Sequence, residues 1–359
     1  MRTTPVAAMG VLLGVEPLNR VVVAAAATAA YRLRCESRWK AGALHTRFPK
    51  GILSGTIFAI GQDRRPVIRT FERGYRISFP GRWEWNGSKE PVPWDGEVWF
   101  TDGSRTSAGS EAGLYCQRDR AGIVVLLGEH ATVFQAEVLA IMRCAQNLLE
   151  SDRALEGLRI NSRLVRDCKC VLDELAEKND VGLIWVPGHA GIKGNEMADL
   201  LAKEAAETRL LGPEPAVGIS FCLGRGRIRS WLRDQHLEYW KEETESKCRQ
   251  ARVMLGECLS RNLARSIRSL GRGDARLATQ LLTGHGDLNY HLHKLGRSDT
   301  PSCRLCGEEE ETSLHILGNC PALVGPRTRL LGSGFLKPNQ VRQLPVGDLL
   351  RFWKQAGPR

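Results

Sequence analysis

Apolar positions change their spacing several times through the middle of the chain, over residues 93–208. Short apolar runs are typical of buried strands, and apolar residues three and four positions apart are typical of helices. The order of these patterns predicts a mixed β-sheet flanked by helices, an α/β fold. The predicted strands cover 98–101, parts of 111–130 and 181–186, and the predicted helices cover 134–150, 162–179 and a segment that includes Asp199.

The regions before and after this α/β segment have different patterns. Residues 17–35 form an Ala-rich run that predicts a helix, and Pro91 and Pro93 mark a linker. Beyond residue 209, apolar residues recur at helical spacing with basic residues on the other faces. The predicted divisions are 1–92, the 93–208 α/β domain, a helical basic region over 209–300, a small cysteine-containing element over 301–325, and a tail over 326–359.

The hydrophobic and cysteine patterns favour a protein of the cell interior. The apolar run at 21–31 is too short to cross a bilayer and lacks a secretory cleavage context. The 11 cysteines are scattered and do not have the dense spacing of a disulfide scaffold. We therefore expect an intracellular protein, cytoplasmic or nuclear, with no membrane partner.

The formal net charge of +11 favours a polyanionic partner, above all nucleic acid. Residues 209–359 contain 24 Lys and Arg against 15 Asp and Glu, a difference of +9, so most of the excess lies there. The basic helix faces either contact phosphates or are ordinary solvated surface. The arginines in question are Arg227, Arg229, Arg233, Arg265, Arg268 and Arg272.

Three acidic residues stand where separate elements could direct them to one point. Asp102 follows the strand-like run VWFT, Glu137 lies in the first turn of a predicted helix, and Asp199 lies early in another. Taken singly, Asp102 is a turn former and Glu137 serves the helix dipole. Taken together, three carboxylates supply the oxygen ligands that Mg²⁺ requires.

These residues belong to longer motifs, GEVWFTDGS, ATVFQAEVLAI and DVGLIWVPGHAGIKGNEMADLLAKEAA. Their order and spacing resemble the type 1 ribonuclease H domain, most closely that of insect non-LTR retrotransposons. The resemblance covers about a third of the chain, residues 93–208. It implies a five-stranded mixed sheet flanked by helices.

The resemblance also implies an activity, the metal-dependent hydrolysis of RNA in an RNA/DNA hybrid. Asp102, Glu137 and Asp199 would then hold Mg²⁺ or Mn²⁺, and His189 in the loop PGHAGIKG would assist product release. A retrotransposon reverse transcriptase is the implied protein partner, and residues 1–92 look like the end of its thumb and connection. The chain has no aspartate pair of a polymerase palm and should not polymerise.

One acid of the family pattern is missing. The family's third acid ends a strand about twenty residues beyond the glutamate, where this chain has Arg159, Ile160 and Asn161. Asp152, Asp167 and Asp173 are the nearest acids, and none is well placed to replace it. Either GLRI at 157–160 partly fills the gap left by the fourth strand, or the domain is destabilised. A catalytically inactive nucleic-acid-binding remnant and a decayed fragment without a stable fold are therefore the alternatives to an active enzyme.

A second group of chemically active residues has the spacing Cys-x2-Cys-x8-His-x4-Cys. Two residues between the first cysteines allow both thiolates to bind one ion from a tight turn, and the later histidine and cysteine complete a tetrahedron. Glu308–Glu311 argue against a phosphate contact in the same loop, so a structural Zn²⁺ is predicted. The ligands are Cys303, Cys306, His315 and Cys320.

Overall fold

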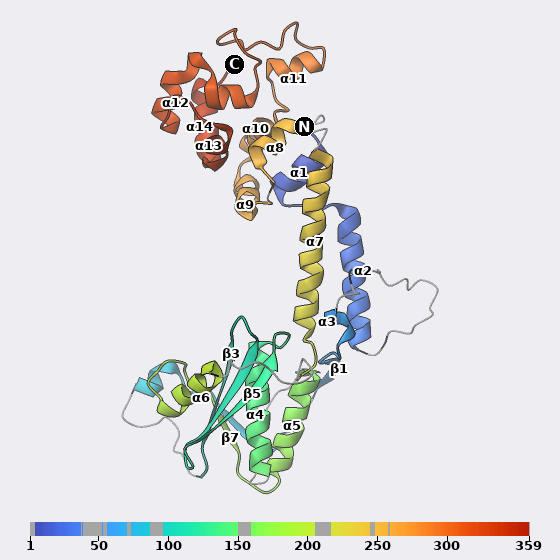
Figure 1. Ribbon diagram of the computed structural model, residues 1–359, viewed down its shortest axis with the longest axis vertical. Coiled ribbons are helices and arrows are strands. Elements are labelled where there is room, and N and C mark those ends of the chain that lie inside the picture. The colour runs from blue at the N-terminus through green and yellow to red at the C-terminus, as the bar shows by residue number, and fades with distance from the viewer. Residues whose placement is uncertain are drawn as a thin grey trace. The chain divides into compact units, whose positions relative to one another are not determined.

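The computed structural model of the chain divides into two compact units, which are drawn in Figure 1 and described separately. One unit contains residues 25–228, and the other contains residues 1–24 together with 229–359. Residues 25–92 thus share a unit with the predicted 93–208 domain. The structure describes residues 4–36, 38, 52, 56–69, 73–86, 96–149, 159–204, 217–244, 248–257 and 259–358. The predicted linker at Pro91 and Pro93 lies outside these residues, as does Asp152.

An antiparallel meander forms the centre of the 25–228 unit. Its strands are β3 (Trp99–Arg105), β4 (Ser110–Cys116) and β5 (Ala121–Gly128), in the order β3-β4-β5. Strand β4 is buried along almost its whole length because it pairs on both sides. Asp102 lies directly opposite Gly113, so these two positions share one face of the sheet.

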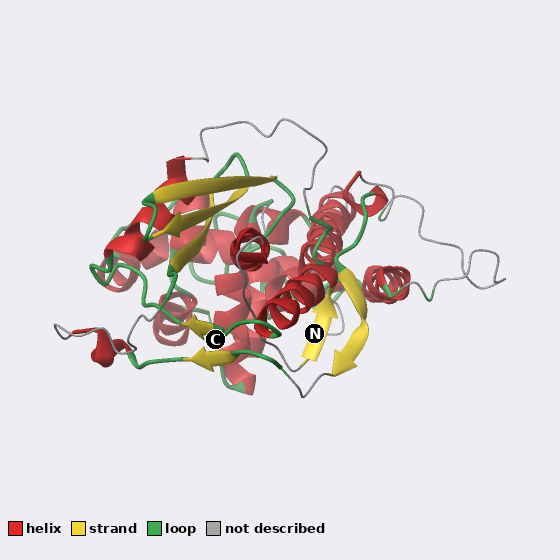
Figure 2. Cartoon of the chain, turned by 90° about the horizontal axis from the view of Figure 1, so that it is seen from below, coloured by secondary structure: helices red, strands yellow, loops and turns green. Residues whose placement is uncertain are grey.

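Helices cover both faces of this meander. Helix α4 (Val133–Leu149) approaches the sheet at Gly103, and α6 (Lys193–Glu204) approaches it at Gly113. Gly103 follows Asp102 along the strand, and successive residues point to opposite faces, so α4 and α6 lie on opposite sides. Helix α5 (Arg163–Ala176) packs on α4 and buries Leu172 and Leu175. The predicted mixed α/β arrangement is confirmed, as Figure 2 shows.

Two short strand pairs complete the unit. Strand β2 (Arg76–Ser78) pairs in parallel with β7 (Gly182–Ile184), with Ile77 opposite Leu183. Strand β1 (Arg64–Arg69) pairs antiparallel with β6 (Arg159–Ser162). The strand that accompanies β7 therefore comes from residues well before β3, and the three hydrogen-bonded groups of strands stand apart in Figure 2.

Of the two alternatives for the gap beside the first strand, partial filling by GLRI is not what the described residues show, because residues 159–162 pair with β1 instead. The buried Asp63 fixes this position. Its carboxylate accepts hydrogen bonds from Ser162 Oγ at 2.7 and 2.8 Å and from the backbone N–H of Leu164 at 2.9 Å. Since Ser162 also caps α5, one buried carboxylate ties β6 and the start of α5 to β1.

The predicted Ala-rich helix is confirmed as α2 (Leu18–Cys35). Within the 25–228 unit, Tyr31 of α2 stacks on Phe221, the first residue of α7 (Phe221–Thr244), with ring centroids 5.4 Å apart. No single helix among the described residues is long and apolar enough to span a membrane. Helix α1 (Val6–Leu13) and α2 meet the length and composition criteria only as a pair, bent by 56°.

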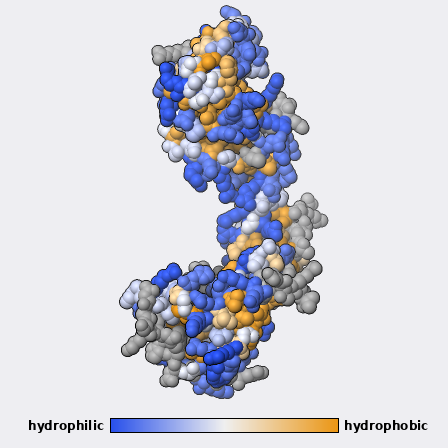
Figure 3. All heavy atoms as spheres, turned by 60° about the vertical axis from the view of Figure 1, so that its left-hand side comes forward, coloured by the Kyte–Doolittle hydropathy of each residue, from blue (hydrophilic) through white to orange (hydrophobic). Residues whose placement is uncertain are grey.

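The other unit is helical, as predicted for the basic region. A single core includes Leu12, Trp240, Met254 and Phe352. The predicted tail is part of it, since residues beyond 326 form three helices and Phe352 is fully buried. On the face drawn in Figure 3, hydrophilic residues cover most of the surface. Besides α1, its elements are α8 (Arg249–Leu255), α9 (Arg261–Ser269), α10 (Arg272–Thr283), α11 (Asn289–Lys294), the π-helical turn η3 (His315–Asn319), η4 (Pro321–Leu323), α12 (Val324–Leu331), α13 (Pro338–Gln343) and α14 (Val346–Ala356).

Candidate functional site

Asp102 lies in β3 beside a glycine that brings α4 close to the strand. One carboxylate oxygen of Asp102 accepts a hydrogen bond from the backbone N–H of Gly103 at 2.8 Å. A Cβ atom added to Gly103 would lie 2.7 Å from Cγ of Glu137 and 2.9 Å from its backbone nitrogen. Only glycine leaves room for α4 to lie this close to β3. The close packing of α4 on β3 places Glu137 next to Asp102.

Asp199 reaches the same point from α6. A Cβ atom on Gly113 would lie 2.1 Å from the carbonyl oxygen of Ala198, so the missing side chain permits α6 to lie directly on the sheet. Asp199 is close enough to Asp102 for their carboxyl groups to share a hydrogen bond. Its other close partner is Lys203 one turn later, with Nζ 2.6 Å from the carboxylate.

Crowding of carboxyl groups perturbs this cluster. Desolvation raises the pKa of Asp102 above its usual range and the charge of Asp199 raises it further, while the Gly103 N–H and Lys203 oppose the shift. Desolvation also raises the pKa of Glu137, with a further contribution from Asp102. The three acids therefore repel one another, and a cation placed among them would relieve this repulsion.

A cleft of about 500 Å³ opens beside the acids. Thr101, Asp102, Glu137 and Asn195 are among its polar lining, and no other carboxylate among the described residues lines it. Asp102 interacts with both Glu137 and Asp199, although Asp199 is not part of the lining. Their role as metal ligands stays a prediction.

An apolar residue, Phe79, lines the cleft just beyond the end of a strand. Strand β2 runs parallel to β7 and ends at Ser78, and the next residue, Phe79, lines the cleft. Asp167 and Asp173 lie elsewhere, on α5, where Asp173 pairs with Lys169 at 3.1 Å. Neither of them lines the cleft. Sequence reasoning missed the part played by β2, because a strand of three residues leaves almost no pattern.

His189 lies in the loop between β7 and α6, outside the lining of the cleft. The side chain is exposed, and the backbone has the left-handed φ of 54° that few residues other than glycine adopt. Its neighbour Gly188 does line the cleft. The loop is therefore adjacent to the acids, and the predicted role of the histidine stays a prediction.

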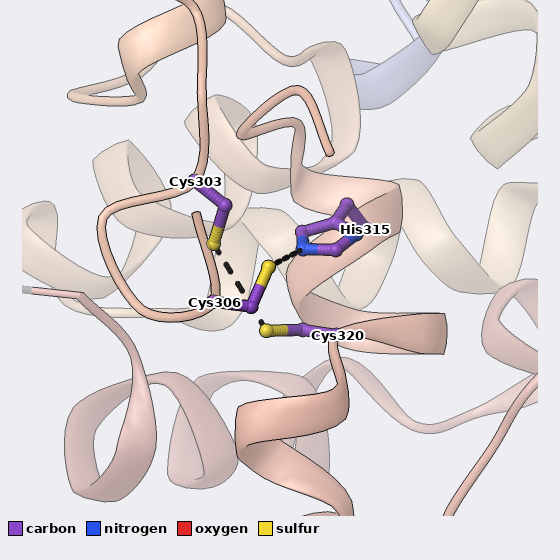
Figure 4. A group of neighbouring side chains, drawn as sticks. All are labelled: Cys303, Cys306, His315 and Cys320. Atoms are coloured by element: carbon purple, nitrogen blue, oxygen red, sulfur yellow. Dashed lines mark hydrogen bonds between the residues drawn. The ribbon is translucent and has the colours of Figure 1, made fainter. Parts of the chain in front are cut away.

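The predicted zinc ligands come together in the helical unit. One ligand atom from each of the four residues lies within 4.8 Å of the other three, and Figure 4 shows the side chains converging. Sγ of Cys303 lies 4.0 Å from Sγ of Cys320, and Sγ of Cys306 lies 3.3 Å from Nε2 of His315. Three sulfurs and one imidazole nitrogen at these separations form a set suited to tetrahedral zinc.

Neighbouring groups orient this cluster. Nδ1 of His315 lies 2.9 Å from a carboxylate oxygen of Glu309, which directs Nε2 toward the sulfurs. Desolvation raises the pKa of the Cys306 thiol, but backbone N–H groups of Glu308 and Glu309 and the His315 ring lower it to about 7. The buried Arg327 donates to the carbonyl oxygen of Cys320 at 2.9 Å.

A third group, Glu97, Cys116 and Asp119, also has ligand atoms within 4.8 Å of one another. Arg118 already binds both acids, at 2.8 Å from Glu97 and 3.1 Å from Asp119. The guanidinium therefore balances the charge that would attract a metal ion.

Part of the same region of the chain is similar in sequence to known proteins. The RNase H family profile matches residues 153–207, which include His189 and Asp199 but not Asp102 or Glu137. The chain is 48% identical over 59 residues to the retrovirus-related Pol polyprotein from type-1 retrotransposable element R1 of Bradysia coprophila. That match covers 16% of this chain and 6% of the relative.

Two polyproteins of Nasonia vitripennis match in the same way. The Pol polyprotein from type-1 retrotransposable element R1 2 is 47% identical over 45 residues, or 12% of this chain and 11% of the relative. That from element R1 4 is 42% identical over 53 residues, or 15% of this chain and 13% of the relative. The chain therefore matches only a small part of the length of these relatives.

Proposed function

We propose, from the premise that this chain carries a ribonuclease H domain similar to that of type-1, non-LTR retrotransposable elements, that it binds RNA/DNA hybrids and hydrolyses their RNA strand. The observation that carries the proposal is the convergence of Asp102, Glu137 and Asp199 beside an open cleft. Three elements that are distant in sequence supply these acids, so chance proximity within one loop does not explain them.

The donor set fits a divalent cation. All three side chains offer carboxylate oxygens, the ligands that Mg²⁺ and Mn²⁺ prefer. Desolvation, with a smaller contribution from the neighbouring carboxylates, raises the pKa of Asp102 and Glu137, and a cation bound among the acids would offset both effects. When bound, such ions activate a water molecule and stabilise the departing oxygen of a phosphodiester.

The residues of the chain have distinct tasks in this proposal. Asp102 on β3 and Asp199 on α6 would hold the cation, and Glu137 on α4 would supply a third oxygen. Lys203, now paired with Asp199 at 2.6 Å, is freed to face a phosphate of the substrate. His189 in the adjacent loop accepts or releases a proton as the product leaves.

Substrate binding rests on charge. The formal net charge is +11, and a nucleic-acid duplex presents phosphates that arginine and lysine neutralise. An intracellular location, cytoplasmic or nuclear, and a reverse transcriptase partner belong to the same proposal. Residues 1–92 would then derive from the end of that polymerase.

A second candidate function is hybrid binding without cleavage. The observation in its favour is Phe79, an apolar residue at the strand end where a further acid would complete the site. A centre with three acids holds its cations less firmly, and a small misplacement of reacting groups lowers the rate by about a hundredfold. We therefore expect slow cleavage, and the binding function would persist if the rate fell to zero.

The Cys303, Cys306, His315 and Cys320 cluster has a structural role in the proposal. A Zn²⁺ ion held there would tie the turn at Cys303 to η3 within the core of the helical unit. Cys303 and Cys320 are almost fully buried. Four protein ligands would complete the coordination of the ion, as in structural zinc sites, and would leave no open position for a substrate.

Cleavage of a labelled RNA/DNA hybrid by the purified chain, with and without Mg²⁺ or Mn²⁺, tests the proposal. Cleavage that requires the ion and disappears in Asp102→Asn supports it. Cleavage that persists in Asp102→Asn overturns it. Hybrid binding with no cleavage by folded protein selects the second candidate.

A further inference from the structure

The helical unit has its own basic cleft, formed by α1, α7 and the start of α9. Its volume is about 410 Å³. Arg229 and Arg233 line it from α7, and Arg261, the first residue of α9, lines it from a different element. Glu16 is the one acidic residue in the lining.

The three arginines are available for a ligand. All are exposed, and none forms an ion pair with an acid among the described residues. Arg229 and Arg233 are four positions apart and so share a face of α7. Arg233 donates a hydrogen bond to Ser230 Oγ at 3.4 Å. Three arginines against Glu16 leave the lining with a positive balance.

A buried polar side chain also lines this cleft. His236 of α7 is 4% exposed and is one of the residues that line the cleft. Desolvation lowers the pKa of its imidazole, and Glu16 only partly opposes this.

The basic surface continues along α9. Arg261, Arg265 and Arg268 follow the spacing of one helix face and are all exposed, whereas Ala264 and Ile267 are buried. No acidic residue occurs between positions 258 and 273. Ser260 caps the helix by accepting from the Leu263 N–H at 3.2 Å, so the positive end of the helix dipole also lies at the cleft.

We propose that this cleft and the arginine face of α9 bind the phosphodiester backbone of nucleic acid, separately from the carboxylate site. The inference deepens the proposed function, on which it rests for the class of ligand. Several arginines in a row match the repeated charges of a backbone better than one isolated phosphate. No Phe, Tyr or Trp lines the cleft, so base stacking contributes nothing there and the binding is independent of sequence.

The test is fluorescence anisotropy of a labelled oligo(dT) strand with the full chain. The test variant combines Arg229→Ala, Arg233→Ala and Arg261→Ala. The control combines Arg249→Ala, Arg297→Ala and Arg329→Ala, which removes the same charge from exposed positions outside the cleft. Thermal melting confirms that both variants are folded.

We expect the test variant to bind about tenfold more weakly and its salt slope to fall by about 2 to 3, as for the loss of three phosphate contacts. The control should change affinity by less than about twofold, through long-range charge alone. Equal losses in the two variants, or no loss in the test variant, would overturn the inference.

A second arm separates the two sources of phosphate. Inorganic phosphate, added at constant ionic strength, should displace the strand only weakly if the backbone is the ligand. Displacement at similar phosphate concentrations would overturn the assignment to nucleic acid. Since oligo(dT) is not a hybrid substrate, this binding test can fail while Asp102-dependent cleavage succeeds, and the reverse also holds.

Discussion

Phe79 and Asp102 line the same cleft, and Phe79 is the residue that follows the strand parallel to β7. Asp102 lies in β3, an edge strand of the meander. Phe79 follows β2, which pairs with β7 and not with the meander, and 75% of its surface is exposed. An apolar side chain so exposed beside a carboxylate gains little from packing. The position is therefore open to an acid without cost to the fold.

Phe79→Asp should raise hybrid cleavage. A carboxylate at this strand end adds a fixed oxygen ligand beside Asp102 and improves cation binding. We expect the rate to increase about tenfold, which corresponds to about 1.4 kcal/mol of activation free energy. The measurement is the initial rate of cleavage of a labelled hybrid as Mg²⁺ is titrated.

Phe79→Asn is the matched control, because it has nearly the same size as Asp and carries no charge. Both variants should melt close to the parent, since the side chain is mostly exposed. Equal rates for the Asn and Asp variants would show that the missing charge is not what limits this site.

Gly103→Ala should destabilise the 25–228 unit and weaken the site together. The added Cβ would lie 2.7 Å from Cγ and 2.9 Å from the backbone nitrogen of Glu137, so α4 must move away from β3. We expect a loss of about 1–3 kcal/mol in the free energy of unfolding, the usual cost of overpacking. Urea denaturation measures it.

Gly182→Ala is the control for that substitution, because no atom lies within 4 Å of a Cβ added at Gly182 in β7. Its effect should stay within about 0.5 kcal/mol. If Gly103→Ala were equally mild, the close approach of α4 to β3 would not be what positions Glu137.

The zinc prediction has two measurable consequences. Purified protein should contain about one zinc ion per chain, and Cys303→Ser should lose it because three ligands hold the ion poorly. The melting temperature of the helical unit should fall by about 5 °C or more in this variant or after chelation. Metal analysis and thermal melting provide the readouts.

Cys170→Ser serves as the matched control, since Cys170 is exposed on α5 in the other unit. It should retain both the zinc and the melting temperature of the parent. Full zinc content in Cys303→Ser would contradict the ligand assignment.

The sequence predicted the elements with strong local patterns. Helix α4 was predicted at 134–150 and runs over Val133–Leu149. The Cys303, Cys306, His315 and Cys320 cluster was predicted because ligand spacing is itself local. Asp102, Glu137 and Asp199 were grouped because three separate predicted elements could direct them to one point, and the resemblance to a family supported this grouping, since each acid alone has an ordinary structural explanation.

The parts that could not be predicted depend on contacts between distant residues. Strand β2 has three residues and pairs with β7 about a hundred positions later, so no local periodicity marks it. Residues 159–162 look like a strand of the main sheet, but the buried Asp63 binds Ser162 and draws them to β1. Which strands pair is decided here by one buried carboxylate, which composition does not reveal.

Hybrid cleavage by the parent chain and by Asp102→Asn in parallel is the most direct test of the central claim, that the converging acids form a metal-dependent hydrolytic site. Asn keeps the side-chain oxygen that accepts from the Gly103 N–H and removes only the charge. The account predicts slow, ion-dependent cleavage by the parent and a loss of about a hundredfold or more in the variant. Equal cleavage by both proteins would contradict it.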